Sequence, residues 1–174
     1  MDDLNRISVE EYKQVEKTPL VVVLDNVRSL NNIGSVFRTS DAFRVAKICL
    51  CGITACPPHR DIHKTALGAE DSVDWEYFET TASCIASLKA QGYKVYAVEQ
   101  VDESIMLDHF VIDTPQPSAI IFGNEVEGVD EEVIPLCDAC IEIPQFGTKH
   151  SLNISIAAGL LIWEMWKQLS VAQS

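Results

Sequence analysis

A run of five apolar residues, from Leu20 to Leu24, constrains the fold of this chain more than any other feature of its sequence. The run has no polar–apolar alternation, so a strand formed here has both faces covered rather than one face in water. Strands covered on both faces are typical of parallel sheets that carry helices on each side. The run therefore predicts the α/β class.

The rest of the chain alternates between strand-like and helix-like patterns. Further strands are expected at 48–51, 73–78, 93–98, 118–122 and 139–143. One helix is expected at 8–17, where the capping-box pair Ser8 and Glu11 begins it. A second is expected to run from Asn31-Asn32, which can cap a helix, to Phe43. Two more are expected at 80–91 and 152–169. Residues 57–60 are expected to form a loop. Strands separated by helices imply crossover connections and a mostly parallel sheet with helices on both faces.

Length and composition predict one domain without membrane spans. The chain has 174 residues, 47% of them hydrophobic, and a chain of roughly 150 residues can bury about 68–70% of its unfolded surface. The longest apolar run, 154–163, is far shorter than the roughly 20 residues of a membrane-spanning helix. Met1 to Leu4 lack the basic and apolar parts of a secretory signal. We therefore expect a cytoplasmic protein that does not contact membranes and whose six cysteines are thiols.

Charge is unevenly distributed along the chain. The net charge of −13 opposes non-specific binding to nucleic acid, because affinity for phosphates comes from Lys and Arg. From Arg28 to Lys64, however, there are six basic residues and two acidic ones, whereas from Lys89 to the end there are four basic and thirteen acidic. This segregation is typical of a basic working face on an acidic body.

Ligands of open parallel sheets bind beyond the carboxyl ends of the strands, which here carry Asp25-Asn26, Gly123-Asn124-Glu125 and Pro144-Gln145-Phe146-Gly147. Three polar segments are the candidates for the chemistry. The segments are 32–39, 123–128 and 143–153. Taken singly, each has a plainer explanation. Arg38 can be a solvated charge, the second segment a tight turn, and Ser151 or Asn153 a helix cap.

Together the three segments resemble the ordered motifs of the SpoU (TrmH-like) family of SPOUT-class RNA 2′-O-methyltransferases. The family pattern has an Asn-x-Gly-x-x-x-Arg-Thr block, then Gly-Asn-Glu-x-x-Gly, then Ile-Pro leading to Ser-Leu-Asn. The corresponding blocks here are Asn32-Ile-Gly34-Ser-Val-Phe-Arg38-Thr39, Gly123-Asn124-Glu125-Val-Glu-Gly128, and Ile143-Pro144 leading to Ser151-Leu152-Asn153. The resemblance runs from about Leu20 to Trp166, in the family's order and spacing.

The resemblance implies a particular fold and cofactor. The sheet would carry a C-terminal deep trefoil knot, so the chain would be one SPOUT methyltransferase domain over 1–174, with a short helical extension at 1–18 and a knotted, cofactor-binding region at about 118–169. S-adenosyl-L-methionine would bind bent in the knot, chiefly through main-chain groups. The cofactor-binding residues carried over are Gly123, Ile143, Gln145, Leu152 and Asn153. Family members act as homodimers in which the catalytic arginine reaches the partner's cofactor.

The resemblance also implies the reaction, which is transfer of the sulfonium methyl to a ribose 2′-hydroxyl of RNA, with tRNA favoured over rRNA. Arg38 takes the position of the catalytic arginine, and Asn32, Glu125, Ser151 and Asn153 match other positions that shape the site. A guanidinium stays protonated in proteins, so clamping an RNA phosphate and stabilising the developing alkoxide suit Arg38 better than acting as a base. Glu125 is expected to orient Arg38 or the partner chain.

Contacts with RNA are expected from Arg28, Arg38, Arg60 and Lys64, although a charge cluster on a loop is more often only solvated.

No metal is expected. The pairs Cys51/Cys56 and Cys137/Cys140 offer four ligands, and His59 and His63 are spaced as in a zinc helix. Yet Cys49, Cys51 and Cys140 fall in expected strands, where a buried cysteine behaves as a small hydrophobe.

Two functions from other classes are kept as alternatives. One is a relative that binds RNA or cofactor without turnover, against which the intact motif residues argue. The other is a thiol-redox protein that uses Cys137 and Cys140.

Overall fold

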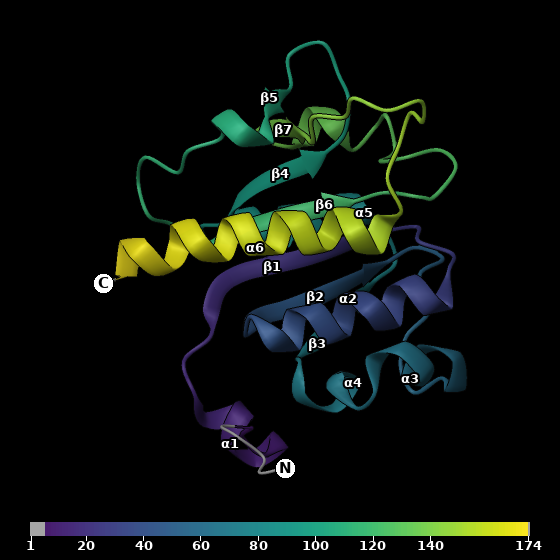
Figure 1. Ribbon diagram of the computed structural model, residues 1–174, viewed down its shortest axis with the longest axis vertical. Helices are drawn as coiled ribbons and strands as arrows, with labels where there is room; N and C mark the ends of the chain where they lie inside the picture. Colours follow the sequence, from purple (N-terminus) through teal and green to yellow (C-terminus); the bar gives the residue numbers. More distant parts are fainter. Residues whose placement is uncertain (1–5, 174) are drawn as a thin grey trace.

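A seven-stranded parallel sheet organises the computed structural model, which describes residues 6–173 and only the backbone of 171–173 (Figure 1). The strand order is β3-β2-β1-β6-β4-β7-β5, and every neighbouring pair is parallel. This confirms the predicted α/β class and the mostly parallel sheet. Met1 to Leu4, on which the expectation of no secretory signal rests, lie outside the described residues.

The strands are short and are joined mainly by helices. The strands are β1 Thr18–Asp25, β2 Val45–Cys51, β3 Trp75–Phe78, β4 Lys94–Val98, β5 Ile105–Met106, β6 Ser118–Phe122 and β7 Ala139–Glu142. The helices are α1 Val9–Gln14, α2 Leu30–Ala42, α3 Arg60–Ala66, α4 Ala69–Ser72, α5 Thr81–Ala90 and α6 Ile154–Gln173, with 3₁₀ turns η1 Leu107–His109 and η2 Ile134–Leu136.

Side chains of β1 alternate between two cores, one on each face of the sheet. Leu20, Val22 and Leu24 point into the core that α2 and α6 cover, whereas Val21 and Val23 point into the core that α5 covers. All five are fully buried, as the unbroken apolar run predicts. The long helix α6 lies beside α2 and crosses β1 and β6 (Figure 1).

Helix boundaries follow local capping chemistry. Ser8 opens α1 with the predicted capping box, in which its hydroxyl accepts the Glu11 N–H and the Glu11 carboxylate accepts the Ser8 N–H. The prediction that Asn31-Asn32 caps α2 is wrong, because the Ser29 hydroxyl accepts the Asn32 N–H and caps that helix. Asn32 therefore lies inside the first turn of α2.

The sequence did not predict α3, α4 or β5. The loop expected at 57–60 ends at His59, whose side chain accepts the Asp61 N–H and caps α3. A Cβ at Gly34 would overlap the Thr65 hydroxyl and the Ile62 carbonyl, so glycine is what lets α3 pack so closely on α2.

Among the described residues, no helix combines the length and apolar character needed to cross a membrane.

Candidate active site

A cavity of about 410 Å³ opens at the carboxyl ends of β4, β6 and β7, which are neighbours in the sheet. Its walls come from the first turn of α2, the residues after β4, the turn after β6, and the segment between β7 and α6. The cavity lining includes the following predicted site residues: Asn32, Gly123, Glu125, Ile143, Gln145, Ser151, Leu152 and Asn153. The structure thus brings together the three segments that the sequence singles out.

The turn 123–128 closes on itself at the end of β6. Asn124 and Gly128 exchange two backbone hydrogen bonds, of 2.9 and 2.8 Å, and the Asn124 side-chain oxygen accepts two further N–H groups of the turn. A Cβ on Gly123 would overlap the backbone of Gly128. Glycine at position 123 is therefore needed for the turn to close, besides lining the cavity.

Glu125 joins this turn to α2. Its carboxylate accepts the backbone N–H of Arg28, at 3.0 and 3.2 Å, and that of Ser29, at 2.9 Å. Partial burial raises the pKa of Glu125, but these hydrogen bonds and one from Asn32 outweigh it, so the pKa lies below its usual value. Within residues 6–173 no hydrogen bond or ion pair joins Glu125 to Arg38, so any influence of Glu125 on Arg38 in the same chain passes through α2.

Two residues that the sequence analysis missed, Glu99 and Gln100, connect the other walls. The Glu99 carboxylate accepts the N–H groups of Val129 and Gln100, both at 3.0 Å. The Gln100 side-chain amide donates to the His150 carbonyl oxygen at 3.1 Å. Both residues directly follow β4, which pairs with β6 and β7, and this position is the only sequence signal that could have found them.

Asp25 anchors the residues that follow the turn. Its side chain lies at the end of β1 and is 1% exposed. The carboxylate accepts hydrogen bonds from the Thr81 hydroxyl, from the Asn26 amide at 3.0 Å and from the Asp130 N–H at 2.9 Å. A buried carboxylate needs such partners, so Asp25 fixes the chain after the turn relative to β1 and α5.

Asn153 caps α6, as one of the plainer sequence explanations predicts. Its side-chain oxygen accepts the N–H of Ser155 at 2.8 Å and the Ser155 hydroxyl at 2.6 Å. The backbone N–H groups of Ser151 and Leu152 form no hydrogen bond within residues 6–173, and both residues line the cavity. These two donors are therefore available to a ligand.

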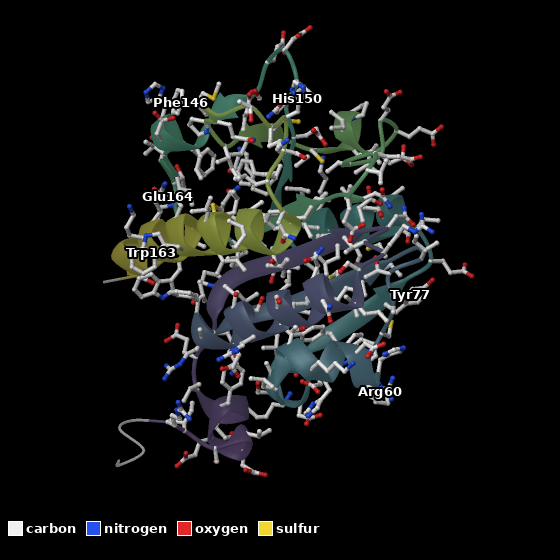
Figure 2. The ribbon with its side chains drawn as sticks, turned by 45° about the vertical axis from the view of Figure 1, so that its right-hand side comes forward. Arg60, Tyr77, Phe146, His150, Trp163 and Glu164 are labelled. Atoms are coloured by element: carbon white, nitrogen blue, oxygen red, sulfur yellow. The ribbon has the colours of Figure 1, made fainter. Side chains whose placement is uncertain are left out.

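The basic side chains expected to contact RNA do not line this cavity. Arg38 is exposed on α2, six residues after Asn32, which corresponds to about 9 Å along the helix. Arg28 contributes its backbone N–H to Glu125, but it is absent from the lining. Arg60 and Lys64 lie on α3, and Figure 2 shows Arg60 at the lower right, far from His150 near the top.

Metal and redox sites find little support. Within residues 6–173 no three His, Cys, Asp or Glu side chains gather as metal ligands would. His63, one of the two histidines spaced as in a zinc helix, contacts a carboxylate instead: its ring nitrogen Nδ1 lies 2.5 Å from the Glu70 carboxylate. Burial raises the pKa of the Cys137 thiol to about 12 and also raises that of Cys140, which disfavours the thiolate that redox chemistry needs. The predicted strand positions of Cys49, Cys51 and Cys140 are confirmed.

Comparison with known sequences identifies close similarity over most of the chain. A family model described as the SpoU rRNA Methylase family matches residues 19–163. A tRNA (guanosine(18)-2'-O)-methyltransferase of Thermus thermophilus is 30% identical over 166 residues, which cover 95% of this chain and 84% of the relative.

Solved structures share the fold. The crystal structure of an A. aeolicus TrmH/SpoU tRNA modifying enzyme superimposes with a TM-score of 0.82 at 25% identity, over 95% of this chain and 82% of the other. An AdoMet-bound rRNA methyltransferase from Sinorhizobium meliloti superimposes with a TM-score of 0.81 at 27% identity, over 91% of this chain and 60% of the other. The resemblance seen in three short motifs is therefore confirmed, and the chain belongs to the SpoU rRNA methylase family.

Proposed function

We propose that this chain transfers a methyl group from S-adenosyl-L-methionine to a ribose 2′-hydroxyl of RNA. The observation that carries the proposal is the convergence of three motif segments on one cavity at the carboxyl ends of β4, β6 and β7. Membership of the SpoU rRNA methylase family supports it, and the relative from T. thermophilus is named for this reaction on tRNA.

The cavity suits the cofactor in size and chemistry. Its volume of about 410 Å³ lies in the range of roughly 300–1,000 Å³ that is typical of small-molecule sites. Val98, Phe122 and Ile141 give it an apolar part that suits a purine base, and the free N–H groups of Ser151 and Leu152 suit polar groups. Among the described residues its lining has four glutamates and no Lys or Arg, which favours a ligand with a positive sulfonium.

Cofactor binding is assigned to Gly123, Ile143, Gln145, Leu152 and Asn153, all of which line the cavity. The cofactor supplies an electrophilic methyl group on a sulfonium. The chain's own part is to hold the acceptor hydroxyl in line with that group and to keep water out. Such positioning can lower a barrier by about 7–11 kcal/mol.

Arg38 is assigned to the acceptor rather than to the cofactor. Its guanidinium clamps an RNA phosphate and stabilises the developing alkoxide, while phosphate or water takes the proton of the hydroxyl. Asn32, Glu125 and Ser151 shape the wall beside the reacting groups. Arg38 does not line the cavity of its own chain, which supports a homodimer in which Arg38 serves the cofactor site of the partner subunit.

The exposed side of α6 is the surface that we assign to this dimer. Ile156, Leu160 and Trp163 follow one another at helical spacing and are all exposed, while the opposite side of α6 packs on α2 and β1. An apolar stripe of this kind is typical of a protein interface. We expect Leu160→Glu to convert the dimer to a monomer in sedimentation experiments and to abolish methyl transfer.

A C-terminal knot and the bounds of the domain are part of the same proposal. We assign a deep trefoil knot to about 118–169, within one SPOUT domain over 1–174 that has 1–18 as an extension. Support comes from the strand order, because β4 lies between β6 and β7 while α6 returns to β1 and β6. The segment before α6 must therefore cross back over the sheet.

Transfer RNA is the favoured substrate and ribosomal RNA the alternative, since the relatives include enzymes named for each. RNA contacts are assigned to Arg28, Arg38, Arg60 and Lys64. A cytoplasmic location is part of this proposal.

Transfer of a labelled methyl group to separate pools of tRNA and rRNA tests the function. We expect incorporation by the wild type and none by Arg38→Ala, with the cofactor Kd nearly unchanged, because Arg38 serves the acceptor. Arg38→Lys should also be inactive, since lysine is only a point charge. Cofactor binding without incorporation into either pool would instead identify a binding-only relative.

A further inference from the structure

The segment 146–150 forms an exposed lip beside the cavity. All five residues are exposed, and the Phe146 side chain is 96% exposed. Apart from Gly147 itself and its two neighbours in the chain, a Cβ on Gly147 would meet no heavy atom within 4 Å, so the chain borders open space here. Figure 2 shows Phe146 and His150 at the upper end of the molecule. We call residues 146–150 the aromatic lip.

The aromatic lip is fixed at the entrance of the cavity. Gln145 precedes it and Ser151 follows it, and both line the cavity. The hydrogen bond of 3.1 Å from the Gln100 amide to the His150 carbonyl ties its far end to the residues after β4. The ends of the lip therefore adjoin the cavity, which places Phe146 beside the opening through which the proposed RNA would reach the methyl donor.

Charge around the aromatic lip differs from charge elsewhere on the chain. No acidic residue occurs between Glu142 and Glu164, and the lip itself carries Lys149 and His150. The chain as a whole has a net charge of −13, and four glutamates line the cavity. A polyanion that approaches along the lip therefore meets a lysine and no acidic side chain of the lip segment itself.

We propose that Phe146 stacks on a nucleobase of the RNA next to the methylated nucleotide, while Lys149 contacts the adjoining phosphate. The inference rests on the proposed function. Single-stranded RNA is commonly bound by an aromatic ring that stacks on a base, with cations alongside that follow the backbone. Because Phe146 is 96% exposed as a residue, its ring is open to such stacking.

Fluorescence anisotropy with a labelled single-stranded RNA of random sequence tests the proposal in the full-length protein. We expect Phe146→Ala to weaken binding roughly 5- to 100-fold and Phe146→Trp to preserve it, because any flat ring can stack. Val111→Ala is the matched control, since Val111 is a 67% exposed apolar residue that precedes β6 and so lies toward the opposite end of the strands. The cofactor Kd should be the same for all of these proteins.

Lys149→Gln adds a second readout. It should weaken RNA binding and reduce the slope of log Kd against log salt by about 0.7, the value for one phosphate contact with a single strand. Phe146→Ala should leave that slope unchanged, because stacking releases no counterions. An unchanged affinity for Phe146→Ala would overturn the proposal.

Three further outcomes separate this inference from a role of Phe146 in dimerisation and from the proposed function. If Phe146→Ala sediments as a monomer where the wild type is a dimer, Phe146 belongs to the subunit interface and the stacking role is overturned. If wild type transfers methyl groups and Phe146→Ala does so with an unchanged KM for RNA, only the stacking role fails. If wild type binds RNA but transfers no methyl group to it, only the proposed function fails.

Discussion

Removing the Glu125 carboxylate is expected to loosen the start of α2 by an amount that depends on pH. The carboxylate accepts two backbone N–H groups, from Arg28 and Ser29, at distances of 2.9 to 3.2 Å. A hydrogen bond to a charged group contributes about 1.5–3 kcal/mol when well buried, and we take about 1 kcal/mol for each here because Glu125 is exposed. Glu125→Ala should therefore lower the free energy of unfolding by about 2 kcal/mol at pH 7.

Glu125→Gln separates charge from hydrogen bonding. The amide oxygen of Gln can still accept one N–H, so we expect a loss of about 1 kcal/mol at pH 7. With a urea m-value of about 2 kcal/mol per molar, this shifts the midpoint of unfolding by about 0.5 M. Because the pKa of Glu125 is lowered in the folded state, its stabilisation is present above the unfolded pKa and is lost as the pH falls through the folded value.

Urea unfolding at pH 7 and at a series of lower pH values, with wild type and both variants, provides the measurement. The difference between wild type and Glu125→Gln should begin to shrink near pH 4.5 and should largely vanish below the folded pKa. Glu127→Gln, in the same turn, should stay within about 0.5 kcal/mol of wild type. A difference that is constant from pH 7 to strongly acidic pH would refute the claim that the charged Glu125 carboxylate stabilises the start of α2.

Three further substitutions test how the cavity walls are held. Gly123→Ala should destabilise the chain by about 1–3 kcal/mol and weaken cofactor binding measured by calorimetry, because its Cβ would overlap the backbone of Gly128; normal binding would contradict this. Gly34→Ala should cost a similar amount in thermal unfolding, since its Cβ would force α3 away from α2, and an unchanged Tm would argue against so close a contact. Asp25→Ala should lower the free energy of unfolding by about 3 kcal/mol, because it leaves buried partners unpaired, and a loss below about 1 kcal/mol would show that water replaces the carboxylate.

The layers of the fold follow from local pattern. The run from Leu20 to Leu24 requires cover on both faces, and any arrangement that left one face in water would expose a row of large aliphatic side chains. The Ser8–Glu11 capping box is equally local. By contrast, both Ser29 and Asn32 occur where the N-cap of α2 is plausible. Which of them caps the helix depends on the hydrogen bond between the Ser29 N–H and Glu125, which lies 96 residues further along the chain.

Elements that depend on distant partners were harder to predict. β5 has two residues and exists only because Ile105 and Met106 pair with β7. Residues Glu99 and Gln100 carry no motif, and their contacts arise from the order of β6, β4 and β7 in the sheet. The motif residues were predictable as a set because the carboxyl ends of parallel strands meet at one edge.

The cavity takes its walls from positions as far apart as Asn32 and Ala157. A polypeptide emerging from the ribosome therefore cannot hold a methyl donor until the first turn of its last helix has been synthesised and has folded back onto the sheet. A chain that stops before that helix lacks one wall of the cavity, so we expect the fragment to be catalytically silent rather than half-active.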